Sequence, residues 1–142
     1  MAEPPRDAEG NILPYDDPDI RGDDGLFRRI DPDNHVIMDR NMGCRRLSSA
    51  AFSESSRVPG GMSVDVERCM QAHGLDPLDD IPEDWGLVRL VTEDLRADGH
   101  KVGSHRLPDR PCHAEVWKKT PKLGGKIKTR SVTWVRKARG IP

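Results

Sequence analysis

The strongest chemical signal in this sequence is a basic segment near the C-terminus, residues 117–139, which also contains two tryptophans. Cationic side chains neutralise phosphates and release counterions, and an indole ring can stack on an unpaired base. The sequence therefore predicts an interface with nucleic acid or another polyanion. The alternative is a solvated charged surface whose tryptophans belong to the core. The predicted interface residues are Lys118, Lys119, Lys122, Lys126, Lys128, Arg130, Trp134, Arg136, Lys137 and Arg139.

Charge is distributed unevenly along the chain. The formal net charge is -1, but residues 1–100 sum to -11 and residues 101–142 to +10. The excess of cations in the C-terminal part indicates an anionic partner. An acidic N-terminal arm could fold back on this basic part and mask it. The alternative is that the two parts attract each other within one fold or across a homodimer.

A second set of residues has the types needed to bind a nucleotide. Arg28 or Arg29 on an early strand, the serine pair Ser48 and Ser49 on a later strand, and Glu115 near the C-terminus form this set. The arrangement resembles that of ADP-ribosyltransferases. The resemblance implies that the arginine holds the phosphates of NAD, that the serines shape the pocket and that the glutamate polarises the ribose. Without such a pocket, the serines satisfy hydrogen bonds at a strand edge and the arginines are exposed.

Histidines form a third group, because His100, His105 and His113 lie near Cys112 in the sequence. A structural zinc site needs four ligands, usually supplied as two close pairs. Cys112 and His113 are adjacent, so their side chains point apart on a strand, and the sequence holds no second close pair. We therefore expect neither a metal site nor a cofactor. His113 enters a strand from a proline-constrained loop, which makes it a candidate acid–base residue, with a structural histidine as the alternative.

Four short stretches, "LFRRI", "RRLSSAAF", "MSVD" and "PCHAEV", together carry a second resemblance. Their combination resembles a group of small bacterial proteins that have no assigned activity. The resemblance implies a bacterial, intracellular protein and supplies no mechanism.

Strands are predicted where short apolar runs are bounded by turn residues. The turn "DPDN" separates the runs 26–30 and 35–40, so these two are expected to form a hairpin. Residues 44–52 alternate small and larger side chains, as a third strand would. Residues 112–118 predict a further strand.

Three segments have helical features. Residues 63–73 predict a helix that Ser63 caps and Gly74 ends. Residues 87–99 fit either a helix or a strand that runs into a short helix, and the second interpretation is favoured. Residues 126–139 fit a helix or a strand, because the lysine and arginine spacing favours the helix and the β-branched content favours the strand; the helix is preferred.

Composition sets the class of fold. With 35% hydrophobic and 33% charged residues in 142 positions, the chain has enough apolar surface for one modest core. The expected architecture is α+β: a small, mostly antiparallel sheet with two or three helices. Residues 1–25 are expected to be a disordered or draped acidic arm, and residues 26–142 a single domain.

Cysteine usage and hydropathy give an expectation for the compartment. Three widely spaced cysteines without a CxxC pair indicate free thiols in a reducing compartment. No apolar run approaches 18 residues, so we expect a cytoplasmic protein without membrane contact. The favoured function is a binding module for an anionic partner. An ADP-ribosyltransferase-like enzyme is the second expectation, and a structural or regulatory module with a protein partner or homodimer the third.

Overall fold

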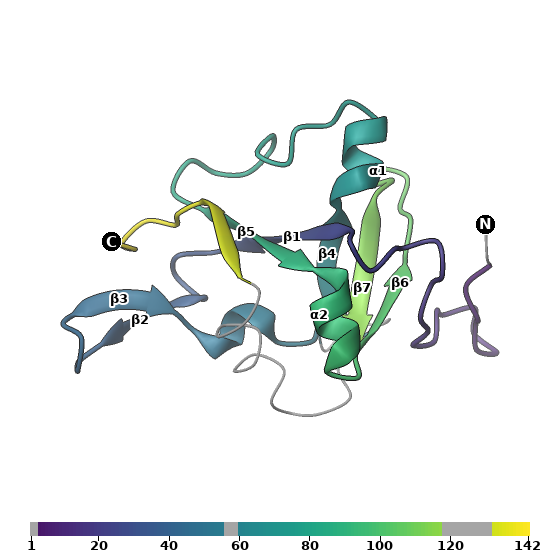
Figure 1. The fold of residues 1–142 in the computed structure, drawn as a ribbon, viewed down its shortest axis with the longest axis horizontal. Coiled ribbons are helices and arrows are strands. Elements are labelled where there is room, and N and C mark those ends of the chain that lie inside the picture. The colour runs from purple at the N-terminus through teal and green to yellow at the C-terminus, as the bar shows by residue number, and fades with distance from the viewer. Residues whose placement is uncertain (1–2, 56–59, 118–131) are drawn as a thin grey trace.

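The computed structural model describes residues 3–55, 60–117 and 132–142, and it has the predicted α+β class. Six strands pair in the order β6-β7-β4-β1-β5-β8, and each of these pairings is antiparallel (Figure 1). The strands of this sheet are β1 (Gly25–Ile30), β4 (Met62–Val66), β5 (Gly86–Val91), β6 (Lys101–Ser104), β7 (His113–Trp117) and β8 (Thr133–Arg136).

The predicted hairpin between residues 26–30 and 35–40 is wrong. β2 (Val36–Asp39) pairs with β3 (Cys44–Leu47) as a separate two-stranded ribbon at one end of the molecule (Figure 1). β1 lies instead between β4 and β5, because Leu26 and Phe27 are both buried and so give this strand two apolar faces. A strand that is buried on both faces belongs in the middle of a sheet.

The predicted strand over residues 44–52 ends early. β3 stops at Leu47, and Ser49–Phe52 form a short 3-10 helix, η1. The hydroxyl of Ser48 accepts a hydrogen bond from the amide of Ala50, which turns the chain out of the extended conformation. Phe52 then enters the core with 1% of its surface exposed.

The main core covers one face of the six-stranded sheet. Strand alternation sends every second side chain of β1, β4, β5 and β7 to this face, where Leu95 of helix α2 (Thr92–Ala97) and Phe52 of η1 pack against them. A smaller apolar cluster of Phe27, Ile81 and Leu87 lies apart from this core. The buried main-core residues of these four strands are Leu26, Ile30, Met62, Val64, Val66, Val88, Leu90, Ala114 and Val116.

Two strands run directly into helices. β5 continues into α2, which confirms the favoured interpretation of residues 87–99. β4 continues into α1 (Glu67–Ala72), so the predicted helix over 63–73 is wrong in its first part. Ser63 lies opposite Glu115 in the β4–β7 ladder and therefore cannot cap a helix.

The C-terminal strand corrects another expectation. Residues 133–136 form β8 at the edge of the sheet, so the preferred helix over 126–139 is wrong for these four residues. Residues 126–131 lie outside the described ranges. In the part of the chain that the structure describes, no helix is both long and apolar enough to cross a bilayer.

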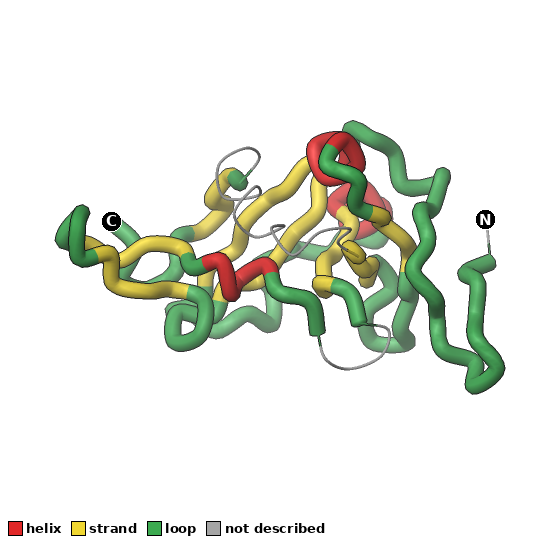
Figure 2. The backbone as a smooth tube through the Cα atoms, turned by 90° about the horizontal axis from the view of Figure 1, so that it is seen from below, coloured by secondary structure: helices red, strands yellow, loops and turns green. Residues whose placement is uncertain are grey.

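The N-terminal segment lies along the β6 edge of the sheet, at the end opposite the β2–β3 ribbon (Figures 1 and 2). The amide of Asp17 donates to the carbonyl of Val102 at 2.9 Å, and the hydroxyl of Tyr15 donates to the carbonyl of Ser104 at 2.7 Å. Ile12 and Ile20 are buried. The acidic segment therefore covers an edge strand that would otherwise expose its backbone groups.

Replacing Gly103 by alanine tests this contact. A Cβ atom at position 103 would lie 2.8 Å from the backbone oxygen of Tyr15, so the arm must move away from β6. We expect a loss of about 1–3 kcal/mol in the free energy of unfolding, measured by urea denaturation. Lys101→Ala, at an exposed position of the same strand, is the control, and equal stability of the two variants would contradict the contact.

Candidate functional site

Alternation along β4 and β7 brings polar side chains together on one face of the sheet. Ser63 lies opposite Glu115, and Asp65 lies opposite His113, so these four residues share a face. Glu115 is also opposite Gly103 of β6 on its other side. All five residues of β7 are buried, so this polar face is covered rather than solvated.

His113 has two hydrogen-bond partners that define its tautomer. Its Nδ1 lies 2.8 Å from the carbonyl oxygen of His105, and its Nε2 lies 2.8 Å from the hydroxyl of Ser63. A carbonyl can only accept, so in the neutral ring Nδ1 carries the proton and Nε2 accepts from Ser63. Burial lowers the pKa of His113, which favours this neutral form.

Glu115 is a buried carboxyl group, 5% exposed, between two histidines. Its Oε1 lies 3.5 Å from Nε2 of His113 and 3.6 Å from Nδ1 of His105. Among the described residues, neither Oε2 of Glu115 nor Nδ1 of His105 has a hydrogen-bond partner. Burial raises the pKa of Glu115 to about 7, although the charges of Arg28 and Arg110 act in the opposite direction.

Two arginines hydrogen-bond Ser63 of this cluster, Arg28 through the carbonyl and Arg110 through the hydroxyl. β1 and β4 pair only at Leu26 and Phe27, and beyond that point Arg28 donates to the carbonyls of Ala51 and Ser63 at 2.9 and 3.0 Å. Burial lowers the pKa of Arg28, while the charge of Glu115 raises it.

Arg110 is held by two residues of β4. Its guanidinium donates to both carboxylate oxygens of Asp65, at 3.0 and 2.9 Å, and to the hydroxyl of Ser63 at 3.3 Å. The loop that precedes β7 is therefore tied to the same strand that presents Ser63.

Close packing holds the Glu115 side chain in place. A Cβ atom at Gly61 would lie 2.8 Å from Oε2 of Glu115 and 2.9 Å from its Cβ, so only glycine leaves room for this side chain. Trp117 and Tyr15 continue the wall, with ring centroids 5.9 Å apart. The absence of a side chain at Gly61 is therefore what makes room for the Glu115 carboxyl group.

The donor atoms of His105, His113 and Glu115 have the spacing of metal ligands. They all lie within 4.8 Å of one another, and the two separations from Oε1 are 3.5 and 3.6 Å. Tetrahedral zinc with ligands at about 2.1 Å places neighbouring donor atoms about 3.4 Å apart. The Nδ1–H of His113 already donates to a backbone carbonyl, which is the usual support for a histidine that ligates through its other nitrogen.

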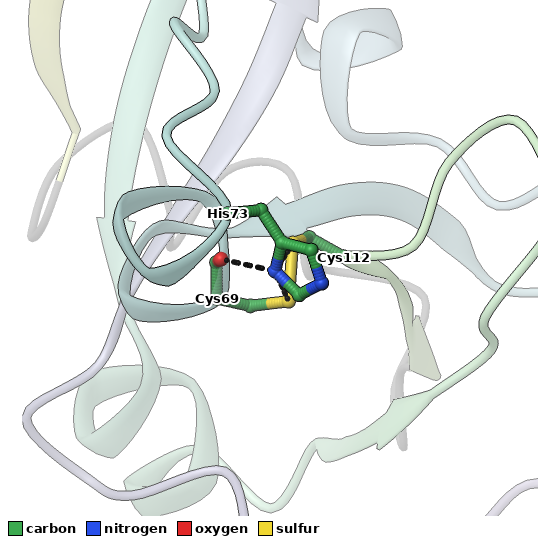
Figure 3. A group of neighbouring side chains, drawn as sticks. All are labelled: Cys69, His73 and Cys112. Atoms are coloured by element: carbon green, nitrogen blue, oxygen red, sulfur yellow. Dashed lines mark hydrogen bonds between the residues drawn. A yellow bond between two sulfur atoms is a disulfide. The ribbon is translucent and has the colours of Figure 1, made fainter.

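A second cluster lies where helix α1 meets the loop before β7. Cys69 and Cys112 form a disulfide, and the ring of His73 lies beside both sulfurs (Figure 3). The expectation of free thiols is therefore wrong for these two residues, and it holds for Cys44. The packing of α1 against the loop brings the Cα atoms of Cys69 and Cys112 to 5.5 Å from each other, a proximity that their spacing in the sequence does not reveal. A cytoplasmic location stays a prediction.

The nucleotide-pocket residues separate into two groups. Arg28 and Glu115 lie close enough to influence each other's charge. Arg29 is the next residue of β1, so its side chain leaves the strand on the other face from Arg28, opposite Leu87 of β5. Ser48 caps η1 and Ser49 is exposed. The ADP-ribosyltransferase-like pocket stays a prediction, although its residues do not form one constellation.

The predicted nucleic-acid interface lies largely outside the described ranges, at Lys118, Lys119, Lys122, Lys126, Lys128 and Arg130. Its described arginines contact their own chain. Arg136 donates to the carbonyls of Trp85 and Pro82, and Arg139 pairs with Asp33 and Asp84.

The remaining predicted contacts lie on or beside β8. Lys137 donates to the carbonyl of Pro142, and Trp134 is half-buried against the main core. The contacts of Arg136, Lys137 and Arg139 use one or two donors of each side chain and leave the others available. The nucleic-acid interface stays a prediction.

Sequence reasoning grouped His105 with His113 but missed Ser63 and Arg110 as their neighbours. Polar residues at every second position of "MSVDV" and "HAEVW" were the available signal, because two such strands can pair with their polar faces aligned. β4 and β7 are far apart in the sequence, so no local pattern specifies that they pair or in which register.

Comparison with known proteins gives no match among family models, curated proteins or solved structures. The choice of function therefore depends on the side-chain geometry of the described residues.

Proposed function

We propose that this protein binds a divalent transition-metal ion, with zinc as the first choice, through His105, His113 and Glu115. The observation that carries the proposal is the pair of buried donor atoms, Nδ1 of His105 and Oε2 of Glu115, that lack hydrogen-bond partners among the described residues. A buried polar atom without a partner destabilises the fold by about 1–3 kcal/mol, and both of these atoms belong to residues of the cluster, so a bound ligand would compensate for this cost.

The donor set favours zinc over the hard cations. Calcium and magnesium prefer oxygen ligands, whereas two imidazole nitrogens and one carboxylate suit zinc and its neighbours in the first transition series. The cluster has three protein ligands, which is the number found in catalytic zinc sites, where the fourth position takes water or substrate. We therefore propose metal-assisted hydrolysis as the activity, with zinc lowering the pKa of its bound water.

The surrounding charges are compatible with this role. Arg28 and Arg110 lower the pKa of Glu115 and so favour the ionised carboxylate that a metal requires. Ser63 lies beside Nε2 of His113, so its hydroxyl would neighbour a metal held by that nitrogen and could hydrogen-bond another ligand of the metal. Its own hydrogen bond to Nε2 must give way when the metal takes that lone pair.

Titration of the metal-free protein with Zn²⁺, and with Co²⁺ as a spectroscopic substitute, tests the proposal. We expect one equivalent to bind and Co²⁺ to give the visible absorption of a site with nitrogen and oxygen ligands. His105→Ala should weaken affinity at least 100-fold, since loss of a supporting partner alone weakens metal binding by about 10–100-fold.

The matched control is His73→Asn, which changes the other histidine cluster while the disulfide stays intact. Unchanged zinc affinity is expected for this variant. Equal affinity of wild type and His105→Ala, or no binding by wild type, contradicts the proposal.

A second candidate function is nucleophilic catalysis by Ser63. It is favoured by the 2.8 Å contact between the hydroxyl and Nε2 of His113, whose Nδ1 is oriented by a carbonyl. The two functions compete for the same lone pair of His113. Ser63→Ala separates them, because it abolishes activity under the nucleophile hypothesis and leaves stoichiometric zinc binding under the metal hypothesis.

A further inference from the structure

A cavity of about 480 Å³ adjoins the disulfide, on the side of the molecule where α1 meets the loop before β7. Cys69, Cys112 and His73 line it together with three arginines, Arg21, Arg68 and Arg106, and one aspartate, Asp19. The cavity thus combines a group that can exchange electrons with an excess of positive charge. We propose that the Cys69–Cys112 disulfide is a redox-active site that exchanges with small anionic thiols bound in this cavity.

The two sulfurs differ in access. Cys69 is partly exposed, whereas Cys112 is only 4% exposed. A thiolate that enters the cavity therefore reaches Sγ of Cys69 first, and Cys112 supplies the sulfur that leaves. A disulfide with one accessible sulfur beside a cavity can be attacked by a small thiol in the folded protein, whereas a disulfide enclosed in a core cannot.

His73 stands beside both sulfurs (Figure 3). Its Nδ1 lies 3.7 Å from Sγ of Cys69 and 3.9 Å from Sγ of Cys112, and 2.9 Å from the carbonyl oxygen of Cys69. Because a carbonyl can only accept, Nδ1 carries a proton. The positive end of this N–H dipole lies near both sulfurs and favours negative charge on whichever one leaves.

The exchange proceeds in two balanced steps. In the first, a thiolate attacks Sγ of Cys69, a mixed disulfide forms, the Cys69–Cys112 bond breaks, and its electron pair leaves on Sγ of Cys112. In the second, another thiolate attacks the small-molecule sulfur of the mixed disulfide and releases Cys69 as a thiolate. Two small thiols are oxidised to their disulfide, and the protein disulfide gains two electrons.

The charge of the lining determines the substrate class. Arg68 is paired with Asp24, and Asp19 offsets one of the two remaining arginines, so the lining keeps a small net positive charge, which raises the local concentration of anions. A thiol with carboxylate groups is therefore preferred over a cationic thiol. Arg21 and Arg106 are both exposed and can meet such carboxylates.

The test compares glutathione, which is anionic, with cysteamine, which is cationic, on the folded full-length protein. The protein is first treated with oxidised glutathione so that every molecule carries the disulfide. Each thiol is then added separately, and free protein thiols are counted over time by maleimide mass tagging. At equal thiolate concentration, and relative to a neutral reference disulfide, we expect glutathione to reduce the protein about 10-fold faster than cysteamine. Arg106→Gln should bring this ratio towards one.

Arg40→Gln is the matched control, because Arg40 carries the same charge in the exposed turn between β2 and β3. It should leave the ratio unchanged. Three results overturn the proposal: failure of the two cysteines to join, reduction only after the protein is unfolded, or a ratio that Arg106→Gln and Arg40→Gln alter equally.

Discussion

At pH 8 and without metal, the Glu115→Gln variant is expected to be more stable than the wild type by about 3 kcal/mol. The fold raises the pKa of Glu115 from 4.5 to about 7, so folding disfavours the charged form of this buried group. Each unit of pKa shift corresponds to about 1.4 kcal/mol. Glutamine has the shape of the protonated acid and avoids the penalty of burying a charge.

The sign of the pH dependence follows from the same shift. A carboxyl group with a raised folded pKa contributes full stability below pH 4.5 and loses it as the pH rises through 7. The two proteins should therefore be nearly equal at pH 4.5 and diverge up to about pH 8. Urea denaturation at a series of pH values in a chelating buffer measures this difference.

Comparing the two proteins isolates Glu115 from its neighbour. His113 has a lowered pKa, so it gives an opposite slope below pH 6.5 in both proteins. Glu83→Gln is the control, because Glu83 is exposed and should show no such pH-dependent gain. A Glu115→Gln variant that tracks the wild type at every pH would falsify the raised pKa.

At about 100 times its dissociation constant, zinc should remove most of the stability difference between the two proteins. A ligand that binds only the folded state stabilises it by about 2.7 kcal/mol at 100 times its dissociation constant. The wild type gains this stabilisation, whereas the glutamine variant has lost a charged ligand and gains less. A buried carboxylate that destabilises the metal-free fold and stabilises the metal-bound one has a functional reason to be there.

The fold class follows from the sequence, but the pairing of strands does not. The run "LFRRI" predicts a strand, and β1 is one, yet its neighbours β4 and β5 come more than 30 residues later. A local turn signal such as "DPDN" favours the nearest hairpin, which is why residues 35–40 were the expected partner. Burial of both faces of β1 outweighs that local preference.

The candidate site was predictable to a similar extent. His113 and Glu115 stand two residues apart on a predicted strand, so their shared face follows from alternation alone. Ser63 has an equally good local explanation as a helix cap, and only the ladder between β4 and β7 rules it out. His105 joins the site through the antiparallel approach of the loop after β6, which no local pattern records.

Replacing Phe52 by alanine is expected to destabilise the protein by about 3–5 kcal/mol, measured as the free energy of unfolding in urea. Phe52 is 1% exposed and is among the largest fully buried side chains of the described residues. Its neighbour Ala51 supplies the carbonyl that accepts from Arg28, and Arg28 in turn lowers the pKa of Glu115. The phenylalanine therefore fixes η1 in the core and, through it, one charge beside the site.

Met42→Ala is the control, since Met42 is 70% exposed and should change stability by less than about 0.5 kcal/mol. The comparison also decides how the stretch "RRLSSAAF" functions. A large effect at Phe52 means that this stretch anchors η1, which Ser48 caps, in the core. An effect as small as that of Met42→Ala would mean that η1 is not packed against the sheet, and the carbonyl that holds Arg28 would then lose its support.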